Sequence, residues 1–185
     1  MIFSETIGAI HTEEQFNRLA LEAFRYQLQR NRVYAEFIDA LGIHASRVNH
    51  YSRIPFLPIE FFKTQDVYAA EDEPAITFRS SGTSGMERST HAIADASLYR
   101  SSLLEGFRNI YGDPSRYLIC ALTPSADENP TSSLAFMIDA WINAGAQPGS
   151  GFYLNKPKRL AEILLASSHS YAPKSPKGDL LPPLQ

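Results

Sequence analysis

Between residues 75 and 166 the apolar pattern switches repeatedly between that of a strand and that of a helix, and this alternation constrains the fold more than any other feature. Short apolar runs such as residues 75–78 alternate with longer stretches whose apolar residues recur at helical spacing. Strands that are joined through helices run parallel. The pattern therefore predicts an α/β fold, with a mainly parallel sheet and flanking helices.

Five further segments define this alternation. A helix is expected after Asp95, whose side chain can cap it, and a strand is expected over residues 117–122, where an unbroken apolar run indicates burial on both faces. The next helix, residues 133–144, is apolar nearly all round and is expected to be buried. A short strand at residues 151–154 and a helix from Pro157 to residue 166 complete the series.

The regions before and after this series have different patterns. Residues 1–74 are expected to form a helical N-terminal region, with a long helix from Thr12 and a shorter helix after Asn31. Residues 75–166 then form a partial α/β nucleotide-binding core. Residues 167–185 hold four of the chain's 12 prolines and show no helical or strand period. This composition predicts a disordered tail.

Residues 54–63 connect the helical region to the α/β core with the sequence Ile-Pro-Phe-Leu-Pro-Ile-Glu-Phe-Phe-Lys. Pro55 disfavours helix at the residue before it, and Pro58 can begin a short helix. The simplest interpretation is an apolar connector packed on the core. Lys63 is the one residue of the segment that we consider as a candidate functional side chain, and a solvated lysine is the simpler explanation for it.

Charge and cysteine content exclude several classes of protein. The net charge of −3, without a basic face, gives no electrostatic footprint for nucleic acid. The single cysteine, Cys120, excludes an internal disulfide framework, and its position within an apolar run indicates a buried small side chain rather than an acyl carrier. The chain lacks an apolar stretch of the ~20 residues that would cross a bilayer, and residues 1–8 lack a secretory pattern. We therefore expect a cytoplasmic protein without a membrane span.

The segment most informative about function is the loop at residues 80–85, which follows the strand expected at residues 75–78. Gly82 and Gly85 permit a tight turn that leaves backbone N–H groups uncovered. The hydroxyl side chains of the loop are Ser80, Ser81, Thr83 and Ser84. Concave loops of this kind bind phosphate oxygens, and Arg88 is a candidate cation beside them. A flexible surface loop is the alternative, although a position between a buried strand and a helix favours ligand binding.

This loop and several segments around it resemble the adenylate-forming enzyme superfamily, and more narrowly its acyl-protein synthetases of the LuxE type (long-chain-fatty-acid luciferin-component ligases). Besides the loop, the resemblance rests on residues 54–63, on Ser89-Thr90-His91 leading to Asp95, on residues 122–125 with 132–134, and on residues 151–154. It extends from about residue 12 to about residue 165. The fold that it implies is an incomplete N-terminal domain of this superfamily.

The resemblance implies an ATP-dependent acid–thiol ligase. A carboxylic acid, a fatty acid in the luminous members, is converted to an acyl-adenylate, and the acyl group then passes to a thiol of a protein or of CoA. The residues implied to hold the ATP phosphates with Mg²⁺ are Ser80, Ser81, Gly82, Thr83, Ser84 and Gly85. Arg88 and His91 are the implied catalytic residues, and for His91 packing at a strand edge is the alternative. Association with an acyl-accepting protein is also implied.

Two departures from the family pattern affect these expectations. Acyl-CoA synthetases commonly continue this loop with Pro-Lys-Gly, where this chain has Glu87-Arg88-Ser89. The later acidic motif and the lysine-bearing lid have no counterpart before Gln185. We therefore expect a fragment that is inactive alone, with residues 167–185 either disordered or frameshifted. The alternatives are a fragment of a phenylacetate-CoA-ligase-like synthetase and a noncatalytic remnant that binds a nucleotide or a partner.

Overall fold

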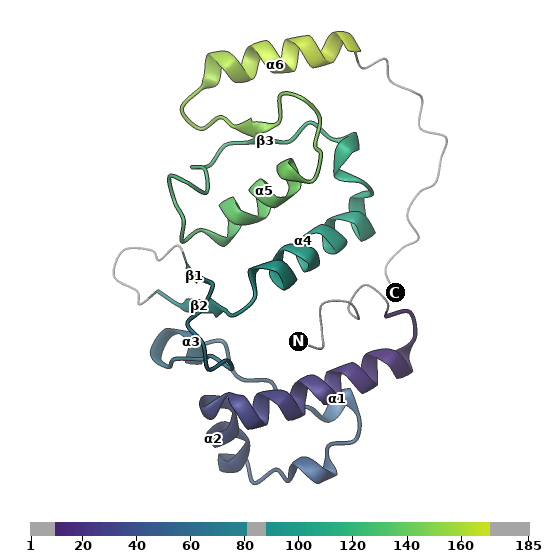
Figure 1. The fold of residues 1–185 in the computed structure, drawn as a ribbon, viewed down its shortest axis with the longest axis vertical. Helices are drawn as coiled ribbons and strands as arrows, with labels where there is room; N and C mark the ends of the chain where they lie inside the picture. Colours follow the sequence, from purple (N-terminus) through teal and green to yellow (C-terminus); the bar gives the residue numbers. More distant parts are fainter. Residues whose placement is uncertain (1–9, 81–87, 171–185) are drawn as a thin grey trace.

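The computed structural model describes residues 10–80 and 88–170, and within them the chain combines helices with two small sheets (Figure 1). This mixture is compatible with the predicted α/β class. The helices are α1 (Glu13–Arg30), α2 (Arg32–Ala40), α3 (Phe61–Thr64), α4 (Ala96–Tyr111), α5 (Ser133–Asn143) and α6 (Pro157–Ser170), and the strands are β1 (Ile76–Arg79), β2 (Thr90–Ile93), β3 (Cys120–Ala121) and β4 (Gly151–Phe152). Short 3-10 turns are η2 (Ala45–Arg47), η3 (Tyr51–Arg53) and η4 (Pro114–Arg116).

Local capping explains where the first two helices begin and end. Thr12 Oγ1 accepts a hydrogen bond from the Gln15 N–H at 3.2 Å, and Gln15 Oε1 accepts one from the Thr12 N–H at 3.1 Å, which together form a capping box. The Asn31 N–H donates to the Gln27 carbonyl at the end of α1. Asn31 Oδ1 accepts from the Tyr34 N–H at 3.1 Å at the start of α2. One residue therefore ends α1 and begins α2.

The helical region encloses a core of its own. Its buried members are Leu21, Phe24, Tyr34, Ile38 and Val48. The rings of Phe24 and Tyr34 meet edge to face with their centroids 6.1 Å apart. The stretch that follows α3 is tied back to α1 by an ion pair between Arg30 and Glu71. In Figure 1 this region forms the end of the molecule that contains α1 and α2.

The strands form two separate pairs, so the predicted single, mainly parallel sheet is wrong for the described residues. β1 and β2 are antiparallel, with Phe78 opposite His91, whereas β3 and β4 are parallel, with Cys120 opposite Gly151. The physical reason is the length of the connections. About ten residues join β1 to β2, which suffices for a hairpin, whereas a parallel crossover needs a dozen or more.

The central α/β elements are less buried than the sequence predicted. The expected strand at residues 117–122 is reduced to β3, where Ala121 is buried while the following Leu122 is 65% exposed. In α5 only Ala135 and Ala140 are fully buried, and Leu134 is 50% exposed. A pair of two-residue strands presents too little surface to cover every apolar side chain around it. Burial of the strand on both faces and of the helix nearly all round is therefore incorrect.

Aromatic side chains hold the α/β elements together. The buried ring of Phe78 on β1 lies 5.4 Å from that of Tyr99 on α4 and 5.5 Å from that of Phe136 on α5. Further along the same helices, the Phe107 and Trp141 rings lie 4.9 Å apart, and Trp141 Nε1 donates to the Leu103 carbonyl. The predicted structural roles of Tyr99 and Trp141 as aromatics packed between helices agree with these contacts.

The last helix, α6, begins at Pro157 as predicted and continues to Ser170, past the predicted end at residue 166. Residues 167–170 are therefore helical, which corrects the start of the predicted tail. The hydroxyls of Ser167 and Ser168 donate to carbonyls one turn earlier, so these serines fit within the helix. Residues 171–185 lie outside the described residues. Each helix in the described ranges is too short or too polar to traverse a bilayer.

Candidate functional site

The β1–β2 hairpin brings together Ser80, the first residue of the Ser/Thr/Gly loop, and Ser89, four residues beyond the end of that loop. The Ser80 N–H donates to the Ser89 carbonyl at 3.0 Å, and the Ser89 N–H donates to Ser80 Oγ at 2.9 Å. We call this pair of residues the neck. Ser89 is 8% exposed and is one of two buried polar residues in the described part of the chain. Ser80 is exposed, so the pair is buried on the Ser89 side alone, and breaking the hydrogen bonds there would leave polar groups of the buried Ser89 without these partners.

His91 lies beside the neck, two residues beyond Ser89 on the same face of the extended backbone. Its Nε2 atom is 3.2 Å from Ser89 Oγ. One face of its ring stacks on Phe62 of α3, with ring centroids 4.7 Å apart and an angle of 20° between the planes. The structure therefore shows His91 packed at a strand position, as the alternative interpretation expected, and also joined to a loop residue by a polar contact.

Two arginines border the neck in the sequence. Arg79 ends β1, Arg88 directly precedes Ser89, and both are exposed. Neither arginine forms an ion pair with a carboxylate among residues 10–80 and 88–170. Positive charge that lacks a neighbouring carboxylate attracts anions. Lys63, which follows Phe62, is also exposed and also lacks an ion-pair partner in these ranges.

The amino end of α5 reaches the same end of the hairpin. The Arg79 N–H donates to the Thr131 carbonyl at 2.9 Å. Ser132 caps the helix by accepting a hydrogen bond from the Ala135 N–H at 3.2 Å, and the first turn contains no acidic residue. The positive end of the helix dipole therefore adds to the positive electrostatic potential of the arginines near the end of β1. The sequence contains the Ser132-Ser133 capping signal, but nothing in its spacing places it next to Arg79.

The predicted site residues fall into two groups. Ser80, Arg88 and His91 are described. Within the hairpin, both Ser80 and His91 make hydrogen-bonding contacts with Ser89. Ser81, Gly82, Thr83, Ser84 and Gly85 lie outside the described residues. The loop does not lead directly into a helix, as the sequence pattern indicated, because β2 intervenes before Asp95.

Asp95 caps α4 as predicted. Its carboxylate accepts hydrogen bonds from the N–H groups of Ser97 and Leu98 at 2.8 and 3.1 Å, and one from the Ser97 hydroxyl at 2.6 Å. The Ser97 hydroxyl and then the Leu98 N–H favour the charged carboxylate, and they lower the pKa of Asp95 below its ordinary value. This cap fixes the direction in which the chain leaves the hairpin.

Cys120 is half-buried at the start of β3. Burial raises the pKa of its thiol, which reduces the thiolate fraction at neutral pH. This environment agrees with a packing role rather than a nucleophilic one. Nor do His, Cys, Asp and Glu side chains of the described ranges form a group of three or more that could hold a metal ion.

Comparison with models of protein families, with curated proteins and with solved structures gives no match for this chain. The functional assignment therefore depends on the geometry of the site. Within the described residues, the neck joins the exposed Ser80 to the buried Ser89, and a histidine, two arginines and a helix amino terminus lie next to it in the structure or the sequence.

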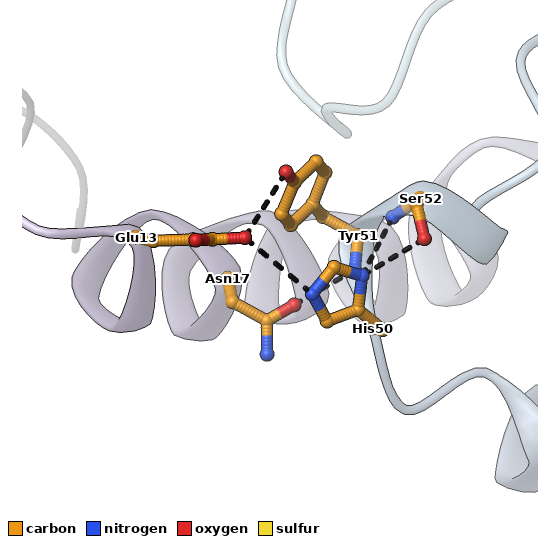
Figure 2. A network of polar contacts seen from close by, with 5 residues as sticks. All are labelled: Glu13, Asn17, His50, Tyr51 and Ser52. Carbon is orange, nitrogen blue, oxygen red and sulfur yellow. Dashed lines mark hydrogen bonds and ion pairs between the residues drawn. The ribbon is translucent and has the colours of Figure 1, made fainter.

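A second polar cluster joins α1 to η3 (Figure 2). The Tyr51 N–H donates to Asn17 Oδ1 at 2.7 Å, and the Tyr51 hydroxyl donates to Glu13 Oε1 at 3.3 Å. His50 Nε2 lies 3.9 Å from the same Glu13 oxygen, and His50 Nδ1 accepts from the Ser52 N–H at 3.3 Å. These side chains satisfy one another across two elements. The cluster therefore anchors η3 to α1. The sequence did not predict it, because Asn17 and Tyr51 are far apart along the chain.

Proposed function

We propose that this chain binds the polyphosphate of a nucleotide at the loop of residues 80–85, which begins at the neck. This loop would be part of an adenylate-forming site of the acyl-protein synthetase type. The observation that carries the proposal is the neck itself, in which Ser80 and Ser89 are joined by two hydrogen bonds next to Arg79 and Arg88. A multiply charged phosphate suits this environment because the exposed Ser80 hydroxyl and the exposed guanidinium groups of Arg79 and Arg88 can donate to phosphate oxygens.

The proposed reaction has two steps. A carboxylate oxygen of the acid attacks the α-phosphorus of ATP, the bond from that phosphorus to the bridging oxygen breaks, and pyrophosphate leaves. The thiol then loses its proton to solvent, its sulfur attacks the acyl carbonyl, the bond from the acyl carbon to the phosphate oxygen breaks, and AMP leaves. The role of the loop is to position the β- and γ-phosphates and to stabilise the charge that develops on pyrophosphate, with Arg79 before the loop and Arg88 after it as the side-chain cations that border it in the sequence.

The thiol acceptor in this proposal belongs to another molecule, either CoA or an acyl-accepting protein. The raised pKa of Cys120 supports this assignment, because a protonated thiol is a weak nucleophile. Mg²⁺, if bound, would neutralise part of the phosphate charge beside the loop residues that hold the phosphates. The acid that is activated is a carboxylic acid, which in the luminous members of the family is a fatty acid.

His91 has a positioning role in the proposed site. Its Nε2 contact holds the hydroxyl of Ser89, and Phe62 covers one face of its ring. If His91 also contacts the transferred phosphoryl group or the acyl carboxylate, as its implied catalytic role requires, that contact must use the edge of the ring or its opposite face. His91→Gln keeps a hydrogen-bonding side chain near Ser89, whereas His91→Phe keeps the stack with Phe62, so the two variants separate these functions.

The binding experiment uses Gly82→Val, measured by titration calorimetry with Mg–ATP and with pyrophosphate. A branched side chain would block both the turn and the approach of phosphate to the backbone, so we expect binding to be abolished while the far-UV circular dichroism is unchanged. Gly106→Ala on α4, remote in sequence from the loop, is the control and should bind as the wild type does. Equal affinity of wild type and Gly82→Val, or no binding by the wild type, would contradict the proposal.

Acid-dependent exchange of labelled pyrophosphate into ATP would favour the proposed enzymatic class over a noncatalytic nucleotide-binding remnant. A dependence of acyl transfer on CoA would favour the phenylacetate-CoA-ligase-like alternative. Transfer to a protein thiol without CoA would favour the acyl-protein synthetase type.

A further inference from the structure

The connector between η3 and α3 carries two very exposed large apolar side chains. Phe56 is 83% exposed, more than any other large apolar side chain of the described residues, and Ile59 is 62% exposed. The prediction that the whole connector packs on the core is wrong for these two residues. Ile54 and Leu57 do pack against the helical core. The connector is therefore anchored by some of its apolar side chains and projects others into solvent.

The backbone of the connector is held rigidly enough to keep these side chains projecting. Pro55 and Pro58 restrict its dihedral angles. The Pro55 carbonyl accepts a hydrogen bond from the Tyr34 hydroxyl at 2.6 Å. After the connector, Phe61 meets Phe37 of α2 edge to face with ring centroids 5.8 Å apart. Contacts with the helical core within and after the connector therefore oppose the folding back of Phe56 onto the protein.

The shape and charge of this surface fit a lipid interface. Small ligands bind in concave sites, and a stable protein interface buries about 800 Å² on each partner, more than two projecting side chains supply. An amphiphilic interface accepts isolated apolar side chains without a matching pocket. Arg53 and Lys63 lie on either side of the connector in the sequence, both are exposed, and neither has an ion-pair partner within the described ranges. Glu60 is the one acidic residue between them.

We propose that residues 53–63 form a docking loop for an anionic lipid surface. Phe56 and Ile59 enter the boundary between headgroups and acyl chains, and Arg53 and Lys63 interact with anionic headgroups. Two side chains and two charges give weak, reversible binding. This inference does not depend on nucleotide binding, because every residue that carries it lies outside the hairpin.

The test is flotation of the full chain with phosphatidylcholine vesicles that contain or lack phosphatidylglycerol. We expect binding to the anionic vesicles, a partition coefficient that falls about tenfold in Phe56→Ala, and a smaller loss in Lys63→Gln that added salt reproduces. Ile110→Ala is the matched control, because Ile110 is 74% exposed at a different place in the chain. It should bind as the wild type does.

A second measurement reports the depth of insertion. The fluorescence of Phe56→Trp should be quenched by lipids brominated on their acyl chains, and that of Ile110→Trp should not. Three results would overturn the proposal: no flotation of the wild type, an equal loss in Ile110→Ala, or no quenching of Phe56→Trp. Self-association without lipid that Phe56→Ala abolishes would also overturn it, because the occupant would then be a second copy of the chain.

Discussion

The helical region before the hairpin and the α/β region after it bury apolar residues by different means. In the helical region, α1, α2 and the segment that follows them enclose a core in which Phe24 and Ile38 are each only 3% exposed. In the α/β region Phe78 is equally buried, but, apart from the connector that carries Phe56, it is here that most large apolar side chains remain exposed, on elements at and around the β3–β4 pair. These include Leu122, Leu134, Leu154 and Leu164, with exposed fractions between 47% and 65%.

The difference follows from how the two kinds of element satisfy their backbones. A helix makes its hydrogen bonds internally, so two helices and a packed connector can close a small core. A strand needs neighbours along both edges, and a parallel sheet needs cover on both faces. With two strands in each sheet, most of the edge and much of the surrounding apolar surface in the α/β region stay uncovered.

The largest effect that we expect from this comparison concerns core truncation. Phe24→Ala should lower the free energy of unfolding by about 3–5 kcal/mol, because a fully buried ring leaves a cavity. Leu122→Ala should change it by less than about 0.5 kcal/mol, because Leu122 is largely in solvent. Urea denaturation followed by far-UV circular dichroism measures both values. A comparable loss in the two variants would show that the α/β region is as tightly packed as the helical one.

A pair of glycines tests the packing of α6. Gly149 has φ +96°, and an added Cβ would lie 3.2 Å from Ile163 Cγ2 and 3.4 Å from Leu118 Cδ1. We expect Gly149→Ala to destabilise the protein by about 1–3 kcal/mol, because a side chain there is both strained and crowded. Gly106 lies within α4 with open space around it. Gly106→Ala should therefore stabilise the protein by about 0.5–1 kcal/mol.

Thermal unfolding of these two glycine variants gives the measurement, with the wild type as reference. If Gly149→Ala melts at the temperature of the wild type, Ile163 does not pack against this turn, and α6 is held more loosely than the structure shows.

The smallest effect concerns Cys120. Burial raises the pKa of its thiol, so alkylation by iodoacetamide at about pH 8 should be slower than for a cysteine in a short peptide. Because the folded pKa is the higher one, the associated stability is present below the ordinary thiol pKa and is lost as the pH rises through the folded pKa. In concentrated urea the difference in rate should disappear. Alkylation of the folded protein at the peptide rate would show that β3 is open to water.

The start of each long helix could be predicted because the signals are local. Asp95 and Pro157 stand at the starts of α4 and α6 as expected. The apolar pattern alone could not predict the pairing of strands, because the same apolar run suits a parallel or an antiparallel neighbour, and the short connection that favours the β1–β2 hairpin becomes informative only once β2 is recognised as a strand. The reduction of residues 117–122 to the two residues of β3 has the same origin.

The candidate site was predictable to a similar extent. The sequence identified Ser80 and His91, and the hairpin brings both to Ser89. It did not identify the buried Ser89 as the residue that joins them, although a serine two residues before a histidine in a strand is placed on the same face. The stack of Phe62 on His91 spans a long stretch of sequence, and no spacing rule predicts it. The same holds for the contact between Arg79 and Thr131.

The stack of Phe62 on His91 has a consequence for the order in which the protein is made. Translation proceeds from the amino terminus, and N-terminal units generally fold first. All the core residues of the helical region precede residue 60, so this core can close on the ribosome before β2 has been synthesised. Phe62 is then already in place when His91 emerges. The nascent hairpin would meet a preformed aromatic surface, which favours the pairing in which His91 lies opposite Phe78.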